Sequence, residues 1–181
     1  GCWRLFGVEQ PNVSVQSGSI QSGRVVKDES RRTLLIVYHS QSGSTEALAA
    51  AVAGGAALEQ EVAVRVRRAP EAGLADLLQC DALLLGSPEN FGFMAGAIKD
   101  FFDRTYYPAQ EHGIVRPYAL FISAGNDGTG AVRQIERIAR GFVLKKIADP
   151  VICRGPVDDH ALERCSELGQ AVAAGLALGI Y

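Results

Sequence analysis

The sequence lacks the features that mark several large classes of protein. No apolar run among its 181 residues approaches the roughly 18 that a membrane-spanning helix needs. The four cysteines are widely spaced and form no CxxC pair, so neither a zinc site nor a redox pair is indicated. The formal net charge of -2 favours neither nucleic acid nor an anionic membrane as a partner. We therefore expect no metal, no nucleic acid, no membrane, and thiols buried in a reducing cytoplasm.

Regular periodicity is also missing from residues 1–32, which are rich in Ser, Gly and Gln. They lack the apolar stretch of a signal peptide, and Leu5 stands where a myristoylation motif needs Ser or Thr. We expect an N-terminal extension, either flexible or left over from processing or expression. An added edge strand around Val13 and Val15 is the alternative. Residues 33–181 are expected to form one domain with a substantial core.

From residue 33 onward, short apolar runs typical of strands alternate with segments of helical periodicity. The predicted strands cover residues 33–39, 61–67, 81–86, 117–123 and 146–153, with Pro150 interrupting the last. The predicted helices cover residues 44–58, 74–78, 95–104, 130–143 and 158–178, with Asp158 or Asp159 as the cap of the last. The period of two in residues 61–67 indicates a strand with one solvated face, at a sheet edge.

This alternation predicts an α/β protein with a doubly wound, five-stranded parallel sheet and helices on both faces. Five strands of this kind commonly take the order 2-1-3-4-5. Ligands then bind beyond the carboxyl ends of strands one, three and four, where the strand order reverses. Each of these three ends should therefore carry unusual chemistry.

The first strand end lies in the stretch LLIVYHSQSGSTEALAAAV, residues 34–52. Hydroxyl groups and Gly43 fill the corner where a helix begins, and a helix N-terminus attracts anions. No lysine precedes the Ser or Thr, as a nucleoside triphosphate loop would require, and no GxGxxG is present. The loop therefore suits a terminal phosphate monoester held by neutral donors. A serine-rich helix cap is the alternative.

The second end reads GSPENFGFM, residues 86–94. Ser-Pro favours an extended start, and Gly92 allows an open turn. Phe91 and Phe93 are bulky for a loop, where they either wall a flat ring or plug the end of the core. The third end, SAGNDGTG (residues 123–130), brackets a polar pair with glycines and offers backbone donors and acceptors at close range. Together the three ends indicate a mononucleotide with a large flat ring.

With these motifs the sequence resembles the flavodoxin-like superfamily from about Thr33 to the C-terminus. IVYHSQSGSTEALA is similar to the loop that binds the FMN phosphate in this family, with Tyr38, Ser40, Gly43 and Thr45 at the expected spacing. GSPENFGFMAGAIKDFFDR is similar to the second flavin loop of flavodoxin-like NAD(P)H:quinone and FMN reductases. The third loop lacks the His-Gly-Gly seen in some quinone reductases of the family.

The resemblance implies a flavodoxin fold that binds FMN non-covalently. The residues that would hold the phosphate are Ser40, Ser42, Gly43, Ser44 and Thr45. Those that would contact the isoalloxazine ring and its N5 edge are Pro88, Glu89, Asn90, Phe91 and Gly92. Those that would meet the polar side of the ring or the ribityl chain are Ser123, Gly125, Asn126 and Asp127.

The same resemblance implies an NAD(P)H-dependent oxidoreductase that reduces quinones or similar small acceptors through FMN, in the cytoplasm, as a homodimer or homotetramer. FMN carries the chemistry, so no side chain is expected to act as a catalyst. The alternatives are a flavodoxin-type electron carrier, for which the mild charge is unusual, and a non-catalytic FMN-binding module. A phosphoacceptor receiver domain is disfavoured, because residues 38–40 and 86–87 lack the acidic residues it needs.

Four further side chains leave alternatives open. Tyr106, Tyr107 and His112 border the substrate face or pack in the core or a dimer. His39, where the first strand ends, is expected to line the pocket or lie on the surface rather than act as a base.

Overall fold

The structure is a computed structural model that describes residues 31–142 and 144–181. Most of the predicted N-terminal extension, including the alternative strand around Val13 and Val15, thus lies outside the described residues. Arg32 already belongs to the first strand. The sheet therefore begins one residue before the domain boundary expected from the sequence.

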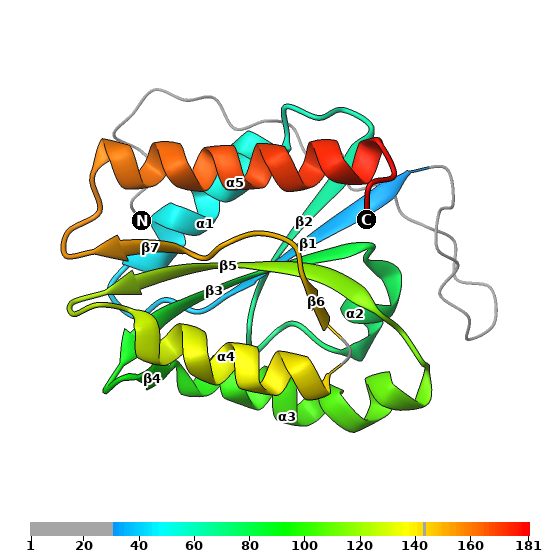
Figure 1. Cartoon of the computed structure of the whole chain (residues 1–181), viewed down its shortest axis with the longest axis horizontal. Helices are drawn as coiled ribbons and strands as arrows, with labels where there is room; N and C mark the ends of the chain where they lie inside the picture. Colours follow the sequence, from blue (N-terminus) through cyan, green and yellow to red (C-terminus); the bar gives the residue numbers. More distant parts are fainter. Residues whose placement is uncertain (1–30, 143) are drawn as a thin grey trace.

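The described residues form an open sheet between two layers of helices (Figure 1). The strands are β1 (Arg32–Tyr38), β2 (Val62–Arg68), β3 (Ala82–Asn90), β4 (Phe93–Met94), β5 (Arg116–Ala124), β6 (Leu144–Lys146) and β7 (Val151–Arg154). The helices are α1 (Ser44–Ala56), α2 (Leu74–Gln79), α3 (Gly96–Glu111), α4 (Thr129–Gly141) and α5 (Asp159–Ala177). The strand order is β2-β1-β3-β5-β6, with β7 also paired to β5. The predicted parallel order 2-1-3-4-5 is confirmed, and only the short β4 is antiparallel to its neighbour β3.

The predicted fifth strand is present as two short pieces along the same edge of β5. β6 pairs with the start of β5 from Arg116, and β7 pairs with its end from Phe121. Pro150 lies between the two pieces and has no N–H group to donate to the ladder. The interruption predicted from this proline is thus seen as a break in the strand.

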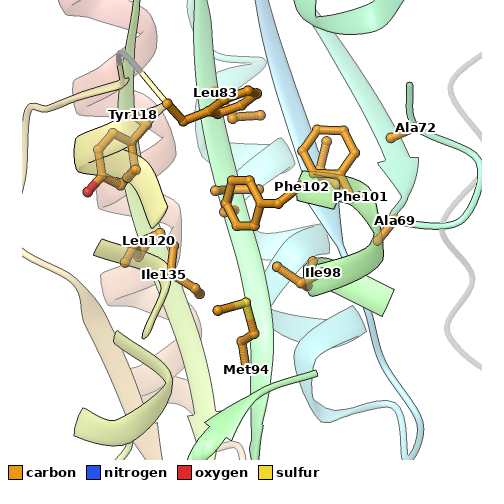
Figure 2. Close-up of a cluster of buried hydrophobic side chains, with 14 of the residues drawn as sticks. Ala69, Ala72, Leu83, Met94, Ile98, Phe101, Phe102, Tyr118, Leu120 and Ile135 are labelled. Carbon is orange, nitrogen blue, oxygen red and sulfur yellow. The ribbon is translucent and has the colours of Figure 1, made fainter. Parts of the chain in front are cut away.

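The two faces of the sheet bury separate cores because successive side chains of a strand point to opposite sides. From β1, Leu34 and Ile36 face α1 and α5, whereas Leu35 and Val37 face α2, α3 and α4. Figure 2 shows part of the second core, with Ile98 and Phe102 of α3 close to Leu83, Leu120 and Ile135. Asp158 caps α5, as predicted, by accepting a hydrogen bond from the Ala161 N–H at 2.8 Å.

Two elements, α3 and β3, extend well beyond their predicted ends. α3 runs to Glu111 instead of residue 104 and contains Pro108, because Thr105 and Ala109 continue the buried stripe of Phe101 and Phe102. β3 runs to Asn90 instead of residue 86, because its end pairs with β4 in a hairpin. The predicted helix over 130–143 ends at Gly141, and residue 143 lies outside the described residues.

The described cysteines, Cys80, Cys153 and Cys165, are all buried. The burial expected from the sequence is therefore confirmed for these three. Burial raises the pKa of Cys165 to about 12, so this thiol stays protonated at neutral pH. None of the described helices has the length and apolar character needed to span a bilayer. Within residues 31–142 and 144–181, no group of three or more His, Cys, Asp or Glu could hold a metal ion.

Two glycines, Gly55 of α1 and Gly169 of α5, let the backbones of these helices pack in direct contact. A Cβ on Gly169 would lie 2.0 Å from the carbonyl oxygen of Val52, and a Cβ on Gly55 would lie 1.9 Å from that of Ser166. Neither position accepts a side chain unless the helices move apart. Because α1 follows the first loop directly, its packing against α5 also holds that loop in place.

We expect Gly169→Ala to lower the free energy of unfolding by about 1–3 kcal/mol, because the added methyl group overpacks the α1–α5 contact. The matched control is Gly54→Ala, also in α1, where a Cβ would meet no atom within 4 Å. That change should raise the free energy of unfolding by about 0.5–1 kcal/mol through helix propensity. Urea unfolding of the three proteins measures both effects, and equal effects would contradict the close contact.

Candidate functional site

The first loop, residues 40–45, joins β1 to α1 and is closed by its own side chains. The Gly43 N–H donates to the hydroxyl of Ser40 at 3.0 Å, and Ser40 is buried. Gly43 precedes α1 with a φ of 96°, a left-handed conformation that favours glycine. Ser42 is exposed, and its Oγ lies 3.5 Å from that of Ser44. No described side chain caps α1, so the N–H groups of its first turn are available to an anion.

The second loop is the hairpin between β3 and β4. Buried Ser87 holds its base: the hydroxyl donates to the Pro88 carbonyl at 2.8 Å and accepts the Ala95 N–H at 2.9 Å. At the tip, Phe91 has a φ of 52° and Gly92 a φ of 76°, the pattern of a type I′ turn. Phe91 is fully exposed, and Phe93 is 56% exposed. The alternative that these rings plug the end of the core is therefore wrong.

The third loop, residues 123–128, joins β5 to α4. Asp127 accepts hydrogen bonds from the backbone N–H of Thr129 at 2.9 Å and from its hydroxyl at 2.8 Å. These two hydrogen bonds hold the pKa of the Asp127 carboxyl below its usual value. Gly125 and Asn126 are exposed. The Asp127 carboxylate thus binds Thr129, the first residue of α4.

Contacts between the loops show that the three strand ends meet at one edge of the sheet. The hydroxyls of Thr45 and Ser123 lie 2.7 Å apart and are buried, which joins the first loop to the third. The carboxylate of Glu89 accepts the Ala131 N–H at 3.1 Å, which joins the second loop to α4. All fourteen residues predicted for the site belong to these loops or to the strand ends that carry them.

The contacts also give three of these residues, Thr45, Glu89 and Asp127, roles that the sequence does not reveal. The hydroxyl of Thr45 is already paired with Ser123 inside the protein. Glu89 and Asp127 both direct their carboxylates to the N-terminus of α4. Their negative charge occupies that helix end, whereas the first turn of α1 has no side-chain cap among the described residues.

Arg68 is a charged neighbour of the first loop that sequence reasoning missed. Loop residues 40–45 contain no cation, as predicted, but the Arg68 guanidinium donates to the Ser40 carbonyl at 3.2 Å. It also lies 3.8 Å from Glu46 and 5.7 Å above the Tyr38 ring. Arg68 is the last residue of β2. Since β2 was expected beside β1, the end of β2 was the signal that could have identified it.

Tyr38 and His39 complete this corner. The Tyr38 hydroxyl donates to Glu46 at 3.2 Å. Burial, followed by the charge of Glu46, raises the pKa of the Tyr38 phenol, so Tyr38 remains a donor at neutral pH. His39 is half-buried, and its backbone N–H donates to the Gly86 carbonyl at 3.1 Å.

A hollow of about 630 Å³ lies between α3 and α4, beside the hairpin rather than at the first loop. Phe93, Lys99, Tyr106, Tyr107 and Arg137 are among the residues that line it. Tyr106 stacks on Phe142 with centroids 5.3 Å apart, while Tyr107 is 73% exposed. The C-terminal half of α3, which carries Tyr106 and Tyr107, extends away from the strand ends (Figure 1). Both tyrosines line this hollow together with Phe93 of the hairpin.

Solved structures share this architecture. A flavodoxin from the domain Archaea superposes with a TM-score of 0.69 at 24% identity, over 80% of this chain and 99% of that one. The chain thus has a flavodoxin-like fold. A sequence model described as "NADPH-dependent FMN reductase" matches residues 55–145, about half of the chain, and includes the second and third loops. The chain belongs to the NADPH-dependent FMN reductase family.

Curated relatives fall into two groups by name. A "Flavodoxin" of Aquifex aeolicus is 27% identical over 161 residues, which cover 80% of this chain and 87% of the relative. An "NAD(P)H dehydrogenase (quinone)" of Paracoccus denitrificans is 32% identical over 124 residues, 57% of this chain and 59% of the relative. The match thus spans little more than half the length of the Paracoccus protein.

The hydroxyl pair between the first and third loops can be tested by a double-mutant cycle. Thr45→Val and Ser123→Ala should each lower the free energy of unfolding by about 1–3 kcal/mol, because each leaves a buried hydroxyl unpaired or leaves a void. The double variant should lose clearly less than the sum of the two, since neither hydroxyl then remains unsatisfied. Urea unfolding gives the three values, and strict additivity would contradict the pair.

Proposed function

We propose that the protein is an FMN-binding, NAD(P)H-dependent oxidoreductase that reduces quinones or similar small acceptors. The observation that carries the proposal is the meeting of three glycine-containing loops at one edge of a flavodoxin-like sheet, joined by the Thr45–Ser123 and Glu89–Ala131 contacts. Membership of the NADPH-dependent FMN reductase family and the relatives named NAD(P)H dehydrogenase (quinone) support it.

The first loop suits the phosphate of FMN. A dianion there meets the free N–H groups of the first turn of α1, the backbone at Gly43 and the hydroxyls of Ser42 and Ser44. Arg68, held beside the loop by the Ser40 carbonyl, adds a positive charge. The buried hydroxyls of Ser40 and Thr45 stabilise the loop itself. Ser40 accepts the Gly43 N–H within the loop, and Thr45 pairs with Ser123 of the third loop.

The second and third loops suit the ring. Pro88, Asn90 and the exposed Phe91 lie on the hairpin, and Gly125 and Asn126 lie on the loop across from it. A Cβ on Gly125 would meet no atom within 4 Å, so backbone there is open to a ligand. When bound, FMN supplies the ability to accept and donate a hydride. The residues of the chain orient the ring, and Phe91 shields one part of it from water.

An electron carrier is the second function that an observation favours, because the Aquifex relative that spans most of the chain is named a flavodoxin. The charge of the chain argues for the oxidoreductase. The formal net charge of -2 is mild, whereas a strongly acidic protein would suit a carrier that docks on basic redox partners.

We further propose that a second copy of the chain packs on the face formed by α3 and α4, in a homodimer or half of a homotetramer. The exposed rings of Phe93 and Tyr107 line the hollow of about 630 Å³ on that face, and aromatic side chains are enriched in protein interfaces.

A cytoplasmic location fits the buried thiols of Cys153 and Cys165.

The proposed function is tested by purifying the chain with added FMN and recording its visible spectrum. We expect stoichiometric uptake of FMN, and rapid bleaching of the flavin band on anaerobic addition of NADPH or NADH, followed by recovery when a quinone is added. A stable yellow colour without bleaching would favour the carrier or a non-catalytic module. No uptake would contradict all three readings.

The position of the phosphate is checked in the same titration with Ser42→Asp. Ser42 is exposed, so the added charge leaves the core intact but faces the phosphate, and FMN affinity should fall at least about tenfold. Riboflavin, which lacks the phosphate, should bind equally to both proteins. Gln170→Glu adds the same charge on the exposed side of α5 and should leave FMN affinity unchanged.

The proposed interface is tested by sedimentation velocity. The purified chain should sediment as a dimer or tetramer at micromolar concentration, and Tyr107→Glu should shift it to the monomer by placing a charge in the apolar contact. His160→Glu, on an exposed position of α5, is the control and should not change the assembly. A wild-type monomer at these concentrations would contradict the interface.

A further inference from the structure

Glu89 occupies an unusual position in the second loop. It lies on the part of β3 that extends into the hairpin, where its backbone pairs with Met94. Its side chain reaches across to α4 and accepts the N–H of Ala131 at 3.1 Å. Ala131 is in the first turn of α4, so the carboxylate lies at the positive end of the helix dipole. An ionised acceptor makes a stronger hydrogen bond there than a neutral one.

The tip of the same hairpin touches α4 at a second point. A Cβ on Gly130 would lie 2.1 Å from the carbonyl oxygen of Gly92, so backbone meets backbone at this contact. Figure 1 shows β4 beside the start of α4. The hairpin is therefore held against α4 by a close backbone contact at its tip and by the Glu89 carboxylate on its strand.

This attachment holds a strained turn. Phe91 adopts a φ of 52°, a left-handed conformation that is unfavourable for a residue other than glycine, asparagine or aspartate. Phe91 is also fully exposed, so no packing within the described residues compensates for this conformation. The hairpin pairing and the attachment to α4 are what keep the turn in this form.

We propose that Glu89 is a positioning residue, which orders the ring-binding loops without touching the ring. Its carboxylate joins the second loop to α4, whose first turn is also bound by Asp127 of the third loop. The two loops that face the ring are thus held by one helix end. The inference rests on the proposed function and differs from the expectation that Glu89 contacts the isoalloxazine.

The test compares Glu89→Ala with Glu89→Gln in titrations with FMN and with riboflavin. Glu89→Ala removes the acceptor and should weaken both ligands by the same factor, about tenfold. Equal loss is expected because the attachment orders the ring-binding loops and leaves the phosphate loop unchanged. Glu89→Gln keeps an acceptor oxygen and should restore both affinities to within about threefold of the wild type. The rate of flavin bleaching at saturating NADPH should follow the same order.

Asp158→Ala is the matched control, because Asp158 also caps a helix by accepting a backbone N–H, at 2.8 Å, but on α5. It should lower thermal stability without changing flavin affinity. The hydrogen bond between the Glu89 carboxylate and the Ala131 N–H is measured independently, by hydrogen exchange of the Ala131 amide in the absence of flavin. Exchange should be faster in Glu89→Ala than in the wild type and in Glu89→Gln.

Three results would overturn the inference. Unchanged flavin affinity in Glu89→Ala would show that the attachment does not order the site. A loss in Glu89→Gln as large as in Glu89→Ala, with a shifted flavin spectrum, would show that the carboxylate contacts the ring. Unchanged exchange of the Ala131 amide would show that the attachment is absent in solution. Failure of the wild type to take up flavin would instead contradict the proposed function itself, and with it the role assigned to Glu89.

Discussion

The parallel register of the central strands is the constraint on which the rest of the structure depends. Tyr38 of β1 lies beside Gly86 of β3, and Gly86 lies beside Phe121 of β5. Because the three strands run in the same direction, their loops emerge at the same edge of the sheet. The hydroxyl contact between Thr45 and Ser123 is possible only in this register. A site made from distant segments thus follows from ordinary sheet pairing.

Charge then distinguishes the N-termini of α1 and α4, two of the helices that begin at this edge. The N-terminus of α4 receives the carboxylates of Glu89 and Asp127, whereas that of α1 receives no side-chain cap among the described residues. The one acidic residue in the first turn of α1, Glu46, is engaged by Tyr38 and lies near Arg68. The edge therefore has one helix end suited to a phosphate and one whose dipole is already used for ordering loops.

Much of this arrangement could be predicted from the sequence, because it depends on local patterns. The positions of the central strands, the proline break in the fifth strand and the Asp158 cap each follow from residues close together in the chain. The strand order was predicted because α/β proteins with five such strands commonly adopt it. The roles of Glu89 and Arg68 could not be predicted in this way. Glu89 meets Ala131, which lies 42 residues away, and Arg68 meets Ser40 at a separation of 28. Only the packed fold decides whether such side chains face a ligand or a helix end. The extension of β3 was missed for a related reason, since Phe93 and Met94 pair with it only after the chain reverses.

The division of the outermost strand into β6 and β7 has a consequence for the protein in crowded solution. An uninterrupted edge would expose a row of backbone donors and acceptors to which a strand of another molecule could add. Here the edge pieces are only three and four residues long, and Pro150 separates them. On the opposite side, β2 ends in the exposed residues Arg65, Val66, Arg67 and Arg68. Short segments, a proline and clustered charge thus discourage β-aggregation at both margins of a sheet whose centre is strongly apolar.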